Sequence, residues 1–270
     1  MSEAAKKALR GFFNLLFPDE CRVCGESLHE VSRIPVCSRC LREPQPLAAE
    51  YYCSACRTPF VTPHPLDPAT GKCALCRQGL QGFDAVYSYG SYEGTLRKLI
   101  HVYKYDGVEP LAAPFGKLLA QVLPREEHFD VVVPMPLHWR KRWQRGFNQA
   151  ELLAREIARR WNAPVNHALR RRRAGRPQAG LTNAQRRSNV AGVFAIKRNL
   201  FDEQKPLKGK RVLLIDDVFT TGATASACAR VLKRAGAEHV TLLALARTDR
   251  RAPVVEIAQA ASSARSSGVT

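Results

Sequence analysis

The sequence predicts an α/β protein, with a parallel sheet flanked by helices and preceded by a small cysteine-rich, metal-binding module. Runs of Val, Ile and Leu, such as 131–133 and 212–215, are typical of parallel strands that are buried on both faces. Segments with helical spacing of apolar residues lie between these runs. Eight of the nine cysteines fall within the first 76 residues, which separates a metal-binding part from the rest of the chain.

These observations divide the 270 residues into three segments. Residues 1–80 are predicted to form an N-terminal helix and a double zinc ribbon, and residues 81–250 to form the α/β domain. Residues 251–270 end in an Ala- and Ser-rich stretch without a core pattern, so we expect a disordered tail.

The composition indicates a globular and strongly basic chain. An apolar content of 45% is enough for a hydrophobic core, and the formal net charge is +18. Arginines cluster at 140–145, 170–176 and 186–187. This excess of positive charge favours a polyanionic partner, although basic surfaces also occur without one.

No run of about 18 continuous apolar residues exists, so the sequence predicts no transmembrane segment. Residues 1–17 are interpreted as a docking helix, because their apolar part is short and lacks a small-residue cleavage site. A helix lying on a membrane surface is the weaker alternative. In the absence of a secretion signal we expect a cytoplasmic protein.

The cysteines form four Cys-x-x-Cys pairs, and each pair can present two thiolates to one tetrahedral ion. The pairs are Cys21/Cys24, Cys37/Cys40, Cys53/Cys56 and Cys73/Cys76. They predict two four-cysteine Zn²⁺ sites, which are structural because no coordination position is left for water. Sequential pairing is the simplest arrangement, and interleaved pairing stays open. Disulfides are the alternative, against which the missing secretion signal argues.

The α/β domain is expected to begin after Cys76. Residues 83–89 alternate like a strand, and residues 93–105 repeat apolar side chains on one helical face. Lys104 follows on the polar side of this helix, and we count it among the ligand-binding candidates. A solvated cation is its alternative role.

Residues 130–134 form a second buried strand, which a cationic loop and a helix at 147–161 follow. The ligand candidates here are His138, Arg140, Arg145 and Asn148. Open α/β sheets bind ligands at the carboxyl ends of their strands, and arginines with helix N–H groups suit a pyrophosphate. The alternative is a solvated basic turn in which His138 is merely packed.

A long cationic connection follows between residues 170 and 194, and it is a candidate lid over the active site. Thr182 can cap a short helix within it. Strands are expected at 193–196 and 240–245.

The stretch 212–224 is the feature around which the other elements are interpreted. A buried strand ends at Asp216 and Asp217, and a loop of small residues follows before a helix at 225–235. The loop candidates are Thr220, Thr221, Gly222, Ala223 and Thr224. Because Gly222 can adopt a positive φ and the loop lies at a helix N-terminus, a phosphate fits there. The two carboxylates can accept hydrogen bonds from vicinal ribose hydroxyls, which indicates a phosphorylated sugar.

The alternative for this stretch is a buried strand that ends in a solvated acid pair, with threonines capping the helix. Within the helix, Cys228 stands between alanines and is expected to be a small packed residue, not a nucleophile.

Together these motifs resemble the ComF family of phosphoribosyltransferase-like competence proteins. The resemblance rests on the double zinc ribbon, Arg-Gly-Phe-Asn-Gln at 145–149, the segment 178–194, and Ile-Asp-Asp at 215–217 with the loop 220–224. It covers nearly everything from residue 17 to about residue 248.

The resemblance implies a type I phosphoribosyltransferase fold for residues 81–250. It implies that the loop 220–224 holds the 5′-phosphate of phosphoribosyl pyrophosphate, and that Asp216 and Asp217 hold the ribose hydroxyls and stabilise the oxocarbenium-like centre during transfer. The basic loop after residue 133 would hold pyrophosphate, with Mg²⁺ bridging pyrophosphate and sugar. Family members are linked to DNA uptake in natural transformation.

Two functions therefore stand. The first is a phosphoribosyltransferase with an unknown acceptor. The second is a non-catalytic competence protein that binds single-stranded DNA, works with the DNA-uptake machinery and uses the nucleotide-like site as a sensor. The zinc ribbons and the arginine excess favour the second function.

Overall fold

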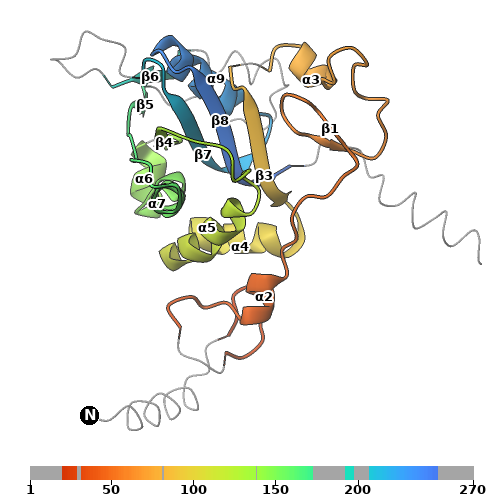
Figure 1. The fold of residues 1–270 in the computed structure, drawn as a ribbon. Coiled ribbons are helices and arrows are strands. Elements are labelled where there is room, and N and C mark those ends of the chain that lie inside the picture. The colour runs from red at the N-terminus through yellow and green to blue at the C-terminus, as the bar shows by residue number, and fades with distance from the viewer. Residues whose placement is uncertain are drawn as a thin grey trace, which may run out of the picture.

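The computed structural model describes residues 20–28, 32–80, 82–137, 139–172, 192–197 and 207–248. The expected helix at 1–17, the helix from Thr182 and the tail at 251–270 lie outside these ranges. Within them, a four-stranded parallel sheet with helices on both faces confirms the predicted α/β class (Figure 1).

The sheet has the order β3–β8–β7–β4, and all neighbouring strands are parallel. Its strands are β3 (Ala85–Ser91), β4 (Val131–Pro134), β7 (Arg211–Phe219) and β8 (His239–Arg247). In register, Val131 lies beside Val212, and Leu214 lies beside Leu242. Because helices cover both faces, the stretches 131–133, 212–215 and 242–246 within the strands are continuous apolar runs.

Three helices cover one face of the sheet and one covers the other (Figure 1). The first group comprises α4 (Gly94–Tyr105), α5 (Ala112–Ala120) and α7 (Gln149–Trp161), and α9 (Ala223–Arg234) lies opposite. Successive residues along each strand contribute alternately to the hydrophobic core on one face of the sheet and to the core on the other. Leu213 and Leu243 pack on the α4–α5–α7 side, whereas Leu214 and Leu242 pack on the α9 side.

Several short elements lie around the sheet. They are the 3-10 helix η1 (Glu109–Leu111), α6 (Trp139–Arg145), β5 (Leu169–Arg171) and β6 (Phe194–Ile196). Strands β5 and β6 pair antiparallel. They belong to the segment interpreted from the sequence as a cationic lid, of which residues 173–191 lie outside the described ranges.

Several element boundaries differ from the sequence prediction; for example, α9 begins at Ala223 and not at residue 225, and β3 covers Ala85–Ser91 and not 83–89. Two further differences have a clear physical cause. Strand β7 does not end at the acids but continues to Phe219, since its backbone stays paired with β8 as far as Arg247. The helix expected at 147–161 begins at Gln149, because Gly146 adopts a φ of 79° and separates α6 from α7.

The two cysteine-rich modules pack into opposite cores. The first contains α2 (Ser38–Arg42), and the second contains β1 (Tyr51–Tyr52), β2 (Pro59–Phe60) and α3 (Ala74–Arg77). Val23 and Val36 of the first module join the core on the α4 side, whereas Phe60 and Leu80 of the second join the core beneath α9. Each module therefore supports one face of the sheet.

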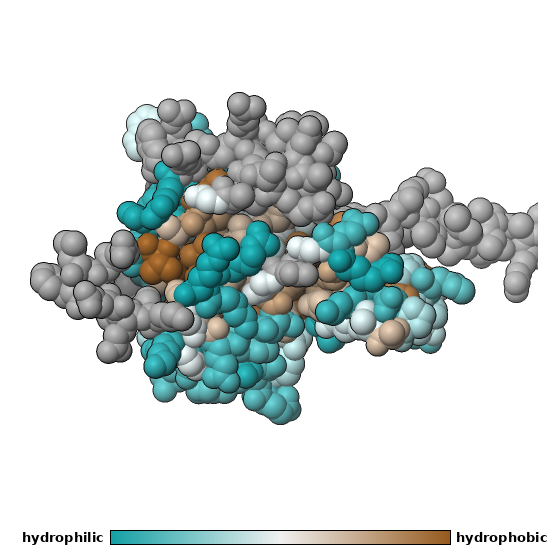
Figure 2. Space-filling view, turned by 90° about the horizontal axis from the view of Figure 1, so that it is seen from above, coloured by the Kyte–Doolittle hydropathy of each residue, from teal (hydrophilic) through white to brown (hydrophobic). Residues whose placement is uncertain are grey.

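From above, a band of hydrophobic residues crosses this side of the molecule, with hydrophilic residues around it (Figure 2). No helix in the described ranges combines the length and the apolar character that are needed to cross a bilayer.

Candidate ligand site and metal centres

The cysteines group sequentially, as the simpler of the two pairings predicted. Cys21, Cys24, Cys37 and Cys40 form one cluster, and Cys53, Cys56, Cys73 and Cys76 form the other. Within each cluster all four sulfurs lie within 4.8 Å of one another. The local fold explains the grouping, because Cys37 and Cys73 are the N-cap residues of α2 and α3 and so start the second half of each site.

The sulfur geometry fits zinc. A tetrahedral ion with Zn–S bonds of about 2.3 Å separates its sulfurs by about 3.8 Å. The Sγ atoms of Cys24 and Cys37 are 3.7 Å apart, and those of Cys53 and Cys76 are 3.8 Å apart. The backbone N–H of Cys73 also donates to Cys53 Sγ at 3.3 Å, which stabilises a thiolate. Both clusters can therefore hold a four-thiolate zinc ion.

The acid pair of β7 faces a lysine from α4. Lys104 Nζ lies 2.8 Å from Asp217 Oδ1, and the two side chains are 11% and 17% exposed. This partial burial strengthens the ion pair relative to one on the surface. Lys104 is therefore a partner of the acid pair and not a solvated cation.

Asp216 occupies a different environment from its neighbour. Desolvation, and then the charge of Asp217, raise the pKa of Asp216 to about 8, while Lys104 acts in the opposite direction. The carboxylate Oδ1 of Asp216 accepts a hydrogen bond of 2.8 Å from the backbone N–H of Asp217. Both effects favour the protonated form of Asp216.

The loop after β7 has the conformation that its sequence predicts. Gly222 is the N-cap of α9 and adopts a φ of 71°. Because glycine has no side chain, it does not cap α9 with a side-chain hydrogen bond. The hydroxyl of Thr221 accepts a hydrogen bond of 3.4 Å from the N–H of Ala223. The loop therefore presents small side chains and a helix N-terminus, an arrangement that favours an anion.

A cavity of about 220 Å³ joins these parts. Its lining includes the predicted site residues Lys104, Arg145, Asp216, Asp217, Thr220, Gly222 and Thr224. Elements that are far apart in the sequence, namely α4, α6, β7 and the start of α9, thus meet at the carboxyl end of the sheet. Thr221 and Ala223 belong to the same loop without lining the cavity.

The loop after β4 forms another wall of this cavity through Met135, Pro136 and Leu137. Asn148 does not line the cavity, but its side-chain amide donates to the carbonyl oxygen of Met135 at 3.1 Å and so holds this loop. Asn148 itself lines an adjoining cavity of about 250 Å³.

Two predicted candidates cannot be compared with the site. His138 lies outside the described residues, and Arg140 is described only as a backbone position in α6. Among the charged residues that line the cavity, one was missed: Arg171, from β5. Burial lowers the pKa of Arg171, and its guanidinium lies 5.6 Å from the ring centre of Phe194. In the sequence it is one member of an arginine run, so nothing distinguished it from its neighbours.

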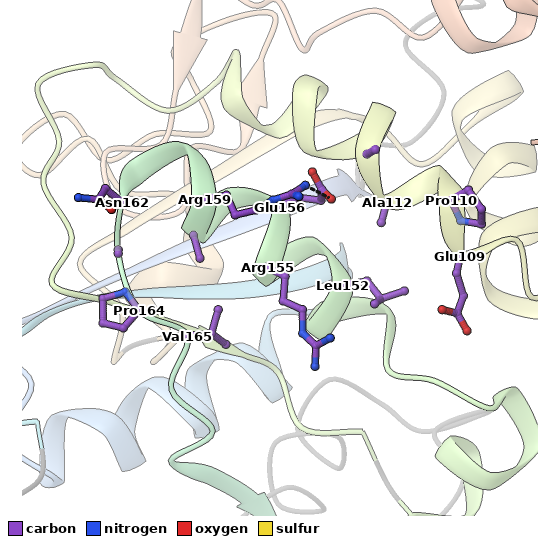
Figure 3. Close-up of a pocket in the computed structure, with 13 residues that line it drawn as sticks. Glu109, Pro110, Ala112, Leu152, Arg155, Glu156, Arg159, Asn162, Pro164 and Val165 are labelled. Carbon is purple, nitrogen blue, oxygen red and sulfur yellow. Dashed lines mark hydrogen bonds and ion pairs between the residues drawn. The ribbon is translucent and has the colours of Figure 1, made fainter.

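A larger groove, of about 920 Å³, lies between α7 and the η1–α5 segment (Figure 3). Its walls include Ala112, Leu152 and Val165, and its acid Glu156 is ion-paired with Arg159. None of the predicted candidates whose side chains the structure describes lines this groove. Size alone therefore does not identify the ligand site, and we assign it to the smaller cavity at the acid pair.

Comparison with known proteins gives consistent similarities. The phosphoribosyl transferase domain family matches residues 145–263. Competence protein F of Haemophilus influenzae is 27% identical over 248 residues, which are 88% of this chain and all of that protein. The DNA utilization protein YhgH of Salmonella typhimurium is 30% identical over 244 residues, which are 87% of this chain and 99% of that protein.

A solved structure is more distant. The glutamine phosphoribosylpyrophosphate amidotransferase of B. subtilis is 24% identical and superposes with a TM-score of 0.34, covering 50% of this chain and 26% of that one.

Proposed function

Because this chain belongs to the ComF family of phosphoribosyltransferase-like proteins, we propose that its acid pair and threonine loop bind phosphoribosyl pyrophosphate with Mg²⁺. We further propose that the phosphoribosyl group is transferred to an acceptor. The observation that carries the proposal is the cavity in which Lys104 and the two acids meet the N-terminus of α9.

Each part of the donor has a matching group in this cavity. The 5′-phosphate fits the loop around Gly222, where small side chains leave the N-terminus of α9 accessible. The ribose hydroxyls are donors, and the carboxylates of Asp216 and Asp217 are acceptors. The guanidinium groups of Arg145 and Arg171 provide positive charge for the pyrophosphate.

Transfer breaks the bond between the anomeric carbon and pyrophosphate, and the pyrophosphate leaves with the electron pair. Positive charge then develops on the sugar, and the two carboxylates stabilise it through the hydroxyls that they hold. The acceptor's lone pair forms the new bond, and the acceptor gives up its proton. Mg²⁺ brought with the donor would offset charge on the leaving group, and carboxylate oxygens are its preferred protein ligands.

Lys104 has a positioning role in this scheme. Its ammonium group is ion-paired with Asp217 at 2.8 Å, so it fixes the orientation of that carboxylate before the ligand arrives. Arg145 is held in a similar way, because it donates to Gln149 Oε1 at 3.0 Å and lies 5.0 Å from the ring centre of Tyr105. Such fixed charges reduce the reorganisation that binding requires.

Isothermal titration calorimetry with phosphoribosyl pyrophosphate and Mg²⁺ tests the proposal. We expect binding by the full chain and its loss when Asp216→Asn and Asp217→Asn are combined. Asp106→Asn is the matched control, since it removes an exposed carboxylate at the C-cap of α4 that pairs with Arg22 of the first cysteine module and does not line the cavity. Binding that survives the double substitution would reject the role of the acids.

A second function, contact with single-stranded DNA, is favoured by an aromatic and cationic stripe that runs along α4 and includes residues just before it and at the end of α6. We define the stripe as Tyr92, Arg97, His101, Tyr105 and Arg145. The rings of Tyr92 and His101 are stacked with centres 6.3 Å apart, and those of His101 and Tyr105 are 5.3 Å apart. Arg97 lies over Tyr92 at 5.9 Å, and Arg145 lies over Tyr105.

The stripe suits unpaired bases and phosphates together. Residues 97, 101 and 105 are spaced four apart, so they share one helical face, and Tyr105 is 64% exposed. Exposed rings stack with bases of any sequence, while arginines attract the backbone. Since Arg145 also lines the ligand cavity, a strand lying on the stripe would lead toward the acid pair. The names of the relatives, which refer to competence and DNA utilization, agree with such a partner.

Fluorescence anisotropy with a labelled thymidine oligonucleotide tests this second function at several salt concentrations. We expect Tyr105→Ala to weaken binding about tenfold and Tyr105→Phe to leave it nearly unchanged, because only the first loses the ring. Arg97→Gln should reduce the salt dependence by about one ion. Arg57→Gln is the control, since Arg57 also lies over a tyrosine, Tyr52, but on the second cysteine module. If Arg97→Gln and Arg57→Gln lose equal affinity for the oligonucleotide, the net charge of the chain and not the stripe would account for binding.

A further inference from the structure

Arg247, the last residue of β8, is a buried cation that lies where β8, the end of β7 and the second cysteine module meet. Only 6% of its surface is exposed. Its Nη1 donates to the carbonyl oxygen of Cys56 at 2.9 Å, and its Nη2 donates to Thr58 Oγ1 at 2.5 Å. The same Thr58 hydroxyl lies 2.9 Å from the Sγ of Cys56, a member of the second cysteine cluster. One side of the guanidinium is therefore held by the second metal site.

The guanidinium of Arg247 also contacts Phe219, whose ring packs against Gly222 in the loop 220–224. The guanidinium lies 5.2 Å from the ring centre of Phe219, and this ring packs edge-on against Phe83 with centres 6.2 Å apart. The Phe219 ring also closes the space beside Gly222, where an added Cβ would lie 2.8 Å from Phe219 Cζ.

A second contact runs from the same module to the same glycine. An added Cβ on Gly222 would lie 2.9 Å from Cδ1 of Leu80, which follows the second cysteine cluster in the chain. Phe219 and Leu80 thus limit Gly222 from two directions. The conformation of the loop is therefore defined partly by residues that the second metal site holds.

The first cysteine module has different contacts. Thr95 Oγ1 on α4 donates to Glu43 Oε1 at 2.6 Å, and Arg22 pairs with Asp106 at 3.4 Å. Lys98 Nζ also donates to the carbonyl oxygen of Val23 at 3.5 Å. Each of these contacts involves α4 or its end, on the face of the sheet away from α9. The two modules therefore differ in what they support.

We propose that Arg247 is a positioning residue that couples metal occupancy of the Cys53–Cys56–Cys73–Cys76 site to the phosphate loop, so that this site controls ligand affinity and the first cysteine site does not. This inference rests on the proposed phosphoribosyl ligand. A buried guanidinium needs acceptors, and it loses two of them when the ribbon that carries Cys56 and Thr58 loosens. The guanidinium then moves away from the Phe219 ring, and the loop 220–224 loses the packing that this ring provides at Gly222.

The first test compares matched losses of metal in the full chain. Cys73→Ser with Cys76→Ser should remove one zinc ion per chain and weaken binding of phosphoribosyl pyrophosphate with Mg²⁺ at least about tenfold. Cys24→Ser with Cys37→Ser should also remove one zinc ion but retain affinity. Zinc is measured by mass spectrometry, affinity by calorimetry and folding by circular dichroism. Equal affinity in the two folded variants would overturn the proposal.

The second test leaves all metal ligands in place. Thr58→Val should keep both zinc ions and weaken ligand binding, because it removes the hydroxyl that Arg247 uses. Thr95→Val is the matched control, since it removes a hydroxyl bond between the first module and α4. A Thr58→Val chain with unchanged affinity and unchanged loop dynamics would contradict the coupling.

Hydrogen exchange separates failure of the inference from failure of the proposed function. Without any ligand, the amides of 220–224 should exchange faster in the second-site variant and in Thr58→Val than in their controls. If the unmodified chain binds no phosphoribosyl pyrophosphate, the proposed function fails, and the exchange rates still decide the coupling. If the ligand binds but the exchange rates and affinities match the controls, the inference alone fails.

Discussion

Asp216 is the residue at which burial and function conflict most directly. Successive side chains on a strand point in opposite directions, so Asp217 is directed toward Lys104 of α4 while Asp216 is directed toward the core that contains Cys228. Burial and the nearby Asp217 charge raise the pKa of Asp216 to about 8. The carboxylate that we propose as an acceptor for ribose hydroxyls therefore favours its protonated form in this environment.

The raised pKa predicts a pH dependence of stability. Between the ordinary value of 3.8 and about 8, the folded chain holds a proton that the unfolded chain has released. The contribution of Asp216 to stability is therefore complete below pH 3.8 and declines as the pH rises to about 8. Urea unfolding should show a less steep decline in Asp216→Asn, which cannot titrate. Identical pH profiles for the two chains would contradict the protonated state.

The same proton predicts the opposite trend for ligand affinity. Since the ionised carboxylate is the better acceptor, binding of phosphoribosyl pyrophosphate should strengthen as the pH rises toward about 8, where Asp216 loses its proton. Calorimetry in buffers with different ionisation enthalpies should detect proton release on binding. An affinity independent of pH in this range, after allowance for titration of the ligand, would count against a role for Asp216.

Lys104 gives a second prediction at the scale of single residues. Lys104→Met keeps much of the side-chain volume but leaves Asp217 without its ion pair, so ligand affinity should fall about tenfold or more. Lys98→Met on the same helix is the control, because Lys98 contacts only the carbonyl oxygen of Val23 among the hydrogen bonds described for it. Calorimetry should show a loss for the first substitution alone.

At the scale of elements, the site depends on how β7 passes into α9. The strand continues beyond the acids to Phe219, and a left-handed glycine then begins the helix three residues later. This short connection brings the acids and the helix N-terminus into one cavity of about 220 Å³. A longer connection would separate the acids, which we propose to hold the sugar, from the loop that we propose to hold its phosphate.

Gly222 provides a matched comparison of backbone strain and crowding. Gly222 and Gly209 adopt φ angles of 71° and 70°, but an added Cβ meets Phe219 and Leu80 only at Gly222 and has open space at Gly209. Both alanine substitutions should cost about 1–2 kcal/mol for the left-handed conformation. Gly222→Ala should cost more and should also reduce ligand binding. If Gly222→Ala and Gly209→Ala lose the same free energy of unfolding in denaturant, crowding by Phe219 and Leu80 makes no contribution.

The elements also show how far the sequence could predict this fold. Runs such as 212–215 identified the strands, and the cysteine spacing identified both metal sites, because these signals are local. The extension of β7 through Asp216 could not be predicted, since backbone pairing with β8 maintains it against the polarity of its side chains. Arg171 was equally indistinct within an arginine run, and only the β5–β6 pairing explains its location.

At the scale of the whole molecule, the two cysteine modules support opposite faces of one sheet. The second module is linked through Arg247 to Phe219, which precedes the loop 220–224, and the hydrogen bonds from Arg247 to Cys56 and Thr58 join residues about 190 positions apart. Sequence patterns do not report a contact of that range, and β8 was predicted only as a strand. The second cysteine cluster is therefore connected through Thr58 and Arg247 to Phe219, the residue that precedes the loop 220–224.

Zinc content gives a prediction at this scale. The two clusters should hold two zinc ions per chain, and strong chelators at elevated temperature should remove them and lower the melting temperature. Readdition of zinc should restore the transition. A chain purified under reducing conditions that contains no zinc, and whose melting does not respond to chelators, would exclude structural metal sites.

The most direct measurement is a crystal structure of the chain with phosphoribosyl pyrophosphate and Mg²⁺. The account predicts the 5′-phosphate on the loop 220–224, the ribose hydroxyls on Asp216 and Asp217, and the pyrophosphate toward Arg145 and Arg171. A ligand bound elsewhere, such as in the groove between α5 and α7, with the acid pair still closed onto Lys104, would contradict it.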